Sequence, residues 1–281
     1  MRRVAAVPIV CVPAALAALA LASTSLASGP SLPALDGGAG IAARGDVRYV
    51  TRLAGSSTVL QQRVRGRTAR TLTLAGGWGI QLATLDGALT GLSPNGRVLV
   101  LGDNVQPNGS LRARSRFAVV DTRTLALTRR IGLRGDYTVD ALSPSGRLLY
   151  LIHHVAGGDA ARYQVRAYDL RAGRVLPGVI ADKRQAGWLM AGFPISRAAT
   201  RDGGRVYTLY RQDDNYPFVH ALDTVHHSAV CIGLPAEWTT AAAWISTARL
   251  SLSGGKLAVR TRSGETRFLL DAKTLRVSTV G

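Results

Sequence analysis

Residues Leu142-Ser-Pro-Ser-Gly-Arg-Leu-Leu-Tyr150 decide the fold, because this tight turn between two apolar runs returns along the chain. Its copies are Leu92–Val100, Thr200–Tyr207, Leu250–Ala258 and, more weakly, Ala42–Tyr49. The turn glycine supplies a positive φ, and Pro, Ser, Asn or Asp before it bends the chain. The aligned glycines Gly45, Gly96, Gly146, Gly204 and Gly255 are 51, 50, 58 and 51 residues apart. A fixed period of this length is typical of a repeat architecture.

A second motif alternates with the first and contains an aspartate. It reads Val119-Val-Asp-Thr-Arg-Thr-Leu125 in its clearest copy, and its aspartates are Asp121, Asp169, Asp223 and Asp271, spaced 48, 54 and 48 residues apart. An aspartate at the end of a strand can accept hydrogen bonds from the backbone amides of the turn that follows. We therefore interpret these four residues as turn formers and not as catalytic acids.

The runs between the turns are short and strand-like, as in Arg162–Tyr168, where apolar and polar residues alternate. Each repeat contains four such runs, A and B around the glycine turn, then C and D around the aspartate turn. Four-stranded sheets at this period are typical of propeller blades. The sequence predicts an all-β chain whose residues 45–281 form a β-propeller of five blades with four antiparallel strands each. Residues 28–44 form an N-terminal segment, within which 31–43 could supply the strand that closes the ring.

The repeats resemble those of a known family. Ser143–Tyr150 and Val119–Gly132 are similar to the repeat units of the YVTN-type secreted β-propellers, within the broader WD40-like group. The resemblance covers nearly the whole chain after the leader and implies architecture far more than activity, since the group contains surface-layer and binding proteins and has lactonases among its relatives. Two repeats depart from the pattern: the first has Val64-Arg65-Gly66 in place of the aspartate, and the fourth has an inserted glycine.

The first 27 residues have the features of an export signal. Arg2-Arg3 precedes an apolar run from Val4 to Ala22, and Ser25-Leu26-Ala27 offers small residues for cleavage. Uncleaved, the same run is just long enough to anchor the chain in a membrane. We predict a secreted, extracellular or cell-surface protein, with membrane contact only through an uncleaved signal segment. Removal of Cys11 with the leader leaves Cys231 alone among apolar neighbours, which favours burial of its thiol.

The charge is strongly basic. The chain has 35 Lys and Arg residues against 17 Asp and Glu, a formal net charge of +18, and loss of Arg2 and Arg3 with the leader lowers it to 18 − 2 = +16. Such a body is attracted to polyanions in a salt-dependent way. The expected partner is an extracellular protein, a glycan or a cell-wall polyanion; export and the lack of a stacked aromatic and basic motif argue against nucleic acid.

In a propeller the A-to-B and C-to-D turns lie on one face, and the more varied B-to-C loops lie on the other, where we expect function. Trp78, Trp188 and Trp238 precede their turn glycines by 18, 16 and 17 residues, which places them near the start of strand A on the loop face. They could form an aromatic rim that stacks on a ligand. The alternative is that these indoles fill the space between blades.

The scarce polar residues gather on the same face: Asp103-Asn104, His153-His154 and Asp213-Asp214 fall in or beside the B-to-C loops of three consecutive blades. Oxygen ligands could hold Ca²⁺, and imidazoles with carboxylates could hold a transition metal. The alternative is a set of solvated loop tips, since no pair has the spacing of a metal motif, so no cofactor is assigned. His220, His226 and His227 are expected at the surface.

These observations predict a non-enzymatic binding or interaction module for an anionic or glycan-like partner, with no catalytic residues assigned. The alternative is a metal-assisted, lactonase-like hydrolase at the channel mouth, which would need Asp103, His153 and Asp213 to meet at one ion. Asp136 and Asp140 flank strand A of the third blade and could act as paired acids, although the sequence offers Asp140 no partner.

Overall fold

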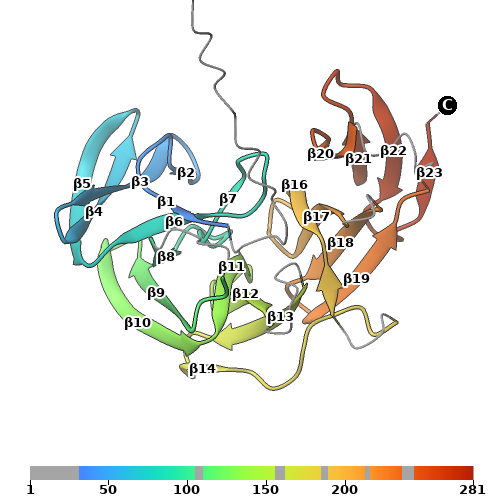
Figure 1. Ribbon diagram of the computed structural model, residues 1–281. Coiled ribbons are helices and arrows are strands. Elements are labelled where there is room, and N and C mark those ends of the chain that lie inside the picture. Colours follow the sequence, from blue (N-terminus) through green and yellow to red (C-terminus); the bar gives the residue numbers. More distant parts are fainter. Residues whose placement is uncertain are drawn as a thin grey trace, which may run out of the picture.

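The computed structural model describes residues 32–104, 110–155, 162–184, 189–212, 216–235 and 244–280. Their strands form five antiparallel sheets arranged around an axis (Figure 1), so the predicted all-β propeller is confirmed. The first sheet contains β2 (Ile41–Ala42), β3 (Val47–Ala54), β4 (Ser57–Val64) and β5 (Arg67–Ala75). The described residues contain no helix long and apolar enough to cross a membrane.

The other four sheets follow in chain order. The second contains β1 (Ala34–Leu35), β6 (Trp78–Leu82), β7 (Leu89–Thr90), β8 (Val98–Asp103), β9 (Arg114–Asp121) and β10 (Ala126–Arg134). The third contains β11 (Asp136–Leu142), β12 (Leu148–His154), β13 (Arg162–Asp169), β14 (Arg174–Val175) and β15 (Met190–Ala191). The fourth contains β16 (Phe193–Ala199), β17 (Arg205–Arg211), β18 (Pro217–Asp223) and β19 (Ser228–Gly233), and the fifth contains β20 (Arg249–Ser253), β21 (Lys256–Arg260), β22 (Thr266–Asp271) and β23 (Val277–Thr279).

The two repeated motifs form the turns predicted from the sequence. The aligned glycines Gly45, Gly96, Gly146 and Gly255 have φ of 66–74° between strands A and B. The fourth repeat differs, because there the positive φ of 70° belongs to Gly203 and not to the aligned Gly204. Asp121 accepts hydrogen bonds from the amides of Arg123 and Thr124 at 2.8 and 3.1 Å, and Asp169, Asp223 and Asp271 repeat this arrangement. Their interpretation as turn formers is therefore confirmed.

The residue four positions after each aspartate adopts a left-handed conformation. It is glycine only in the third sheet, where Gly173 has a φ of 72°; Leu125, His227 and Leu275 have φ of 53–59°. A side chain in this region is strained by roughly 1 kcal/mol or more, because its Cβ approaches the backbone closely. Leu125 is buried in the cluster that joins the first two sheets, so packing offsets the strain.

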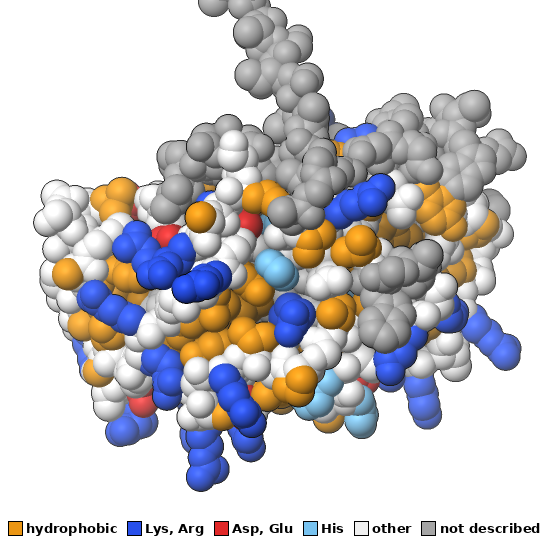
Figure 2. Space-filling view, turned by 60° about the horizontal axis from the view of Figure 1, so that its bottom comes forward, with side chains coloured by type: hydrophobic (Ala, Val, Ile, Leu, Met, Phe, Trp, Pro, Cys, Tyr) orange, Lys and Arg blue, Asp and Glu red, His pale blue; other side chains and the backbone are white. Residues whose placement is uncertain are grey.

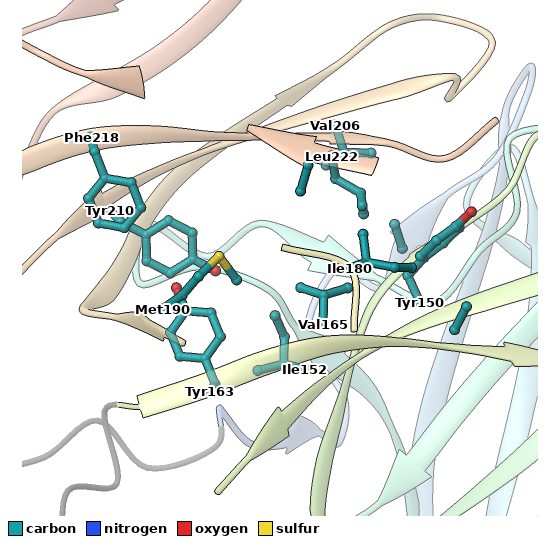
Figure 3. Packing of buried hydrophobic residues seen from close by; sticks show 13 residues of the cluster. Tyr150, Ile152, Tyr163, Val165, Ile180, Met190, Val206, Tyr210, Phe218 and Leu222 are labelled. Atoms are coloured by element: carbon teal, nitrogen blue, oxygen red, sulfur yellow. The ribbon is translucent and has the colours of Figure 1, made fainter. Parts of the chain in front are cut away.

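The hydrophobic core is divided into four clusters, and each joins two consecutive sheets. Figure 3 shows the cluster between the third and fourth sheets, where Tyr163, Tyr210 and Phe218 stack with ring centroids 5.6 and 5.2 Å apart. Among the described residues, no cluster joins the fifth sheet to the first. These two sheets are the ends of the series in Figure 1.

The N-terminal segment contributes to two sheets. β2 lies within the residues expected to complete the first blade and pairs with β3. β1, also in that range, instead pairs with β6 of the second sheet. Two hydrogen bonds also hold this segment against β3. Thr51 Oγ1 donates to the Leu35 carbonyl at 3.0 Å, and the Asp36 carboxylate accepts from the Leu53 backbone N–H at 2.7 Å.

Candidate functional site

The predicted aromatic rim is described only at Trp78, because Trp188 and Trp238 lie outside the described residues. Trp78 begins β6 and is 5% exposed, within the cluster between the first and second sheets. Its Nε1 donates to the Ala75 carbonyl at 2.9 Å. The guanidinium groups of Arg116 and Arg130 lie 5.9 and 5.8 Å from its ring centroid. Trp78 therefore occupies the space between blades that the packing alternative assigned to it.

Asp103, at the end of β8, lies opposite Trp78 on the loop face and is 3% exposed. Arg112 contacts its Oδ1 at 3.1 Å, and Arg116 contacts its Oδ2 at 3.4 Å. Arg112 also reaches Asp136 at the start of β11, with a shortest distance of 2.7 Å. This guanidinium therefore connects the second and third sheets through two buried carboxylates, and Asp103 is already neutralised.

His153 and His154 end β12, on the same edge as Asp136, which pairs with His154 in the register of β11 and β12. His153 stacks on Tyr137 with ring centroids 4.2 Å apart, and burial lowers its pKa. His154 is 8% exposed, and burial lowers its pKa to about 4. Both imidazoles are therefore neutral at pH 7.

The sequence-predicted polar residues converge only in part. Asp103, His153 and His154 share the loop edge of adjacent sheets, with Arg112 and Asp136 between them. Asn104 follows β8, and its backbone N–H donates a hydrogen bond to the Gly77 carbonyl. Asp213 and Asp214 lie outside the described residues. Within the described ranges, no three His, Cys, Asp or Glu residues group closely enough to hold a metal ion.

Asp140 has the partner that the sequence did not reveal. It lies in β11, 3% exposed, and its carboxylate pairs with the guanidinium of Arg197 from β16, which also donates to the Asp140 carbonyl. Arg197 Nε donates to Thr208 Oγ1 at 3.2 Å. A buried charge is stable only when it is paired in this way. No periodicity signals the pair, because its members come from different repeats.

The prediction that His220 lies at the surface was wrong. It is 2% exposed, because β18 is covered on both faces from Pro217 to Leu222 and the ring is enclosed beside Tyr210 and Cys231. Burial lowers the pKa of His220 to about 4. His226 and His227 are exposed, as predicted. Cys231 is half-buried and packs against the same cluster, where burial raises its pKa to about 12.

Acidic side chains in the described part of the chain are all engaged in ion pairs or hydrogen bonds. Those residues are Asp36, Asp46, Asp86, Asp103, Asp121, Asp136, Asp140, Asp169, Asp182, Asp202, Asp223, Glu265 and Asp271. Basic residues are about twice as numerous over the whole chain. Figure 2 shows Lys and Arg side chains spread over the visible face and projecting from its edges, with few acidic ones among them.

Four exposed arginines form a group that we call the arginine strip: Arg114 and Arg116 of β9, and Arg130 and Arg134 of β10. Arg114 pairs with Arg134 in register, and alternate residues share a face, so all four lie on the face of the second sheet that holds Trp78. Together with Arg112 they carry five positive charges. Asp103 and Asp136 carry two negative charges, which leaves 5 − 2 = +3 in this set.

No family model matches the chain, and no curated protein matches it. Solved structures do. The β-propeller domain of Cps50 (Swd1) from Myceliophteria thermophila is 15% identical, with a TM-score of 0.46, over 90% of this chain and 68% of that chain. TolB from Acinetobacter baumannii is 14% identical, with a TM-score of 0.43, over 83% of this chain and 53% of that chain.

The dihydro-heme d1 dehydrogenase NirN is 13% identical, with a TM-score of 0.46, over 88% of this chain and 47% of that chain. These structures include an enzyme as well as a propeller domain. The similarity concerns the β-propeller fold, and function must be argued from this chain's own residues.

Proposed function

We propose that this chain is a non-enzymatic binding module at the cell exterior that binds a polyanion, such as an acidic glycan or a phosphate-containing cell-wall polymer. The observation that carries the proposal is the net charge of +3 on the arginine strip together with Arg112, Asp103 and Asp136. The other acidic side chains that the structure describes are engaged in ion pairs or hydrogen bonds of their own. Guanidinium groups suit this role because they bind phosphate and carboxylate groups through paired hydrogen bonds.

The geometry of the strip supports a polymer better than a single anion. Its arginines lie along two paired strands, so successive anionic groups of an extended polymer can meet successive guanidinium groups. Arg116 and Arg130 are held over the Trp78 ring, which limits the conformational entropy that they lose on binding. The export signal in residues 1–27 would bring this surface to such polymers, and we infer membership of the YVTN-type secreted propellers from the repeats.

The hydrolase alternative is less well supported by the described residues. It requires Asp103 as a metal ligand, but two guanidinium groups occupy that carboxylate. Asp136 and Asp140, the candidate paired acids, are each bound to a different arginine. A carboxylate held in this way would have to break its ion pair before it could take a proton from a substrate or a water molecule.

Binding to long-chain polyphosphate tests the proposal. Gln substitution of the four strip arginines should weaken binding at least tenfold and leave the far-ultraviolet circular dichroism spectrum unchanged. The control replaces four exposed arginines elsewhere, Arg44, Arg201, Arg262 and Arg276, and makes the same change in net charge. Equal losses in the two variants would show that the attraction is non-specific, and no binding by the parent protein would refute the proposal.

A further inference from the structure

A cavity of about 320 Å³ lies near the axis of the propeller, at the junction of the second, third and fourth sheets. We call it the axial pocket. Its apolar lining includes Leu82, Leu85, Val139, Ile152, Phe193 and Pro194. Tyr163 and Tyr210, which stack in Figure 3, also line it. A cavity of this size is within the range of small-molecule sites, which are commonly apolar with a few polar groups.

The charged groups of the axial pocket neutralise each other. Asp140 and Arg197 both line it, and their side chains are 3% and 11% exposed. Because each is the other's counter-ion, a charged ligand would be buried without an opposite charge of its own. Burying an unpaired charge is strongly unfavourable. The pocket therefore favours an uncharged ligand.

His154 gives the pocket a polar group that the protein does not satisfy. Its imidazole is more than nine-tenths buried, and among the described residues its Nδ1 has no hydrogen-bond partner. The His154 and Tyr163 rings are nearly perpendicular, with centroids 6.1 Å apart. A buried polar atom without a partner costs about 1–3 kcal/mol, so a ligand that supplies the partner recovers part of that free energy.

We propose that the axial pocket binds an uncharged, mostly apolar small molecule through one hydrogen bond to His154. The lining supplies hydrophobic burial, and the histidine orients the polar end of the ligand. This site is separate from the arginine strip, whose residues do not line the pocket. The outcome of a ligand-binding test on the axial pocket is therefore independent of the proposed polyanion binding.

Three related probes test the chemistry on the full chain: 1-naphthol, 1-methylnaphthalene and 1-naphthoate, with affinities measured by isothermal titration calorimetry. They share a naphthalene ring and differ in their polar group, which is a hydroxyl, a methyl or a carboxylate. We expect 1-naphthol to bind most tightly and 1-naphthoate least. Binding of none of the three, or tightest binding of 1-naphthoate, would overturn the proposal.

Two substitutions place the probe in the pocket. His154→Phe keeps a ring and removes the nitrogens. It should lower the affinity for 1-naphthol roughly five- to tenfold, the loss expected for one hydrogen bond, and leave the affinity for 1-methylnaphthalene nearly unchanged. His226→Phe, at an exposed turn, is the matched control. Leu85 is 50% exposed at the pocket, so Leu85→Ala should weaken both neutral probes while the chain stays folded. Affinities unmoved by both His154→Phe and Leu85→Ala would refute the site.

Discussion

Removal of the Asp140 carboxylate should destabilise the protein more than its size suggests. Asp140→Leu keeps a similar volume but leaves the guanidinium of Arg197 buried without a counter-charge. Breaking a buried pair in this way costs about 3–5 kcal/mol. The Asp140 carbonyl and Thr208 Oγ1 still accept hydrogen bonds from Arg197, so we expect the lower end of this range, about 3 kcal/mol.

The loss should be measured by urea unfolding followed by circular dichroism. For a chain of this size about 3 kcal/mol corresponds to a fall in Tm of about 6–12 °C. The double variant Asp140→Leu/Arg197→Met removes both charges and should recover most of the lost stability, because apolar replacement of a buried pair is often neutral. A cost below about 1 kcal/mol for Asp140→Leu, or no recovery in the double variant, would refute this account.

Three further predictions concern packing, pH and the thiol. Trp78→Ala should lower the unfolding free energy by about 3–5 kcal/mol in the same urea assay, because the indole fills the space between two sheets; a stable variant would contradict that packing role. Hydrogen bonds from Arg147 and from the turn amides lower the pKa of Asp169 to about 2, so its stabilising contribution is complete above pH 3.8 and is lost as the pH falls through about 2. The difference in Tm between the parent and Asp169→Asn should therefore be constant above pH 4 and shrink toward pH 2, and a difference independent of pH would count against the bond. In a Cys11→Ser background, Cys231 should react with a disulfide reagent much more slowly at pH 8 than it does in denaturant, because burial raises its pKa to about 12; equal rates would be inconsistent with burial.

The repeated features of the fold could be predicted from the sequence because each is local. The turn at Gly146 needs only its own positive φ, and the turn at Asp169 needs only the amides of the next few residues. The same period located the first sheet through Gly45. The C-to-D turn of that repeat contains no aspartate, and Arg65 within it has a φ of 50°.

The contacts that define the candidate sites could not be predicted, because they join different repeats. Arg112 meets Asp136 across two sheets, and Arg197 meets Asp140 from 57 residues away. Burial of His220 depended on how the third and fourth sheets pack together, and its position near a strand end did not reveal this. Periodicity identified the blades, but the side chains between them are specified only by the assembled structure.

The salt dependence of polyphosphate binding tests the central claim most directly. Plotted as log affinity against log salt concentration, the parent protein should give a straight line with a steep negative slope, because binding releases counterions from the polymer. Loss of the four strip arginines should make that slope shallower by roughly 3–4, about one unit per contact removed, while the four-arginine control should change it little. Parallel lines for the parent and the strip variant would contradict the claim that this surface binds the polyanion.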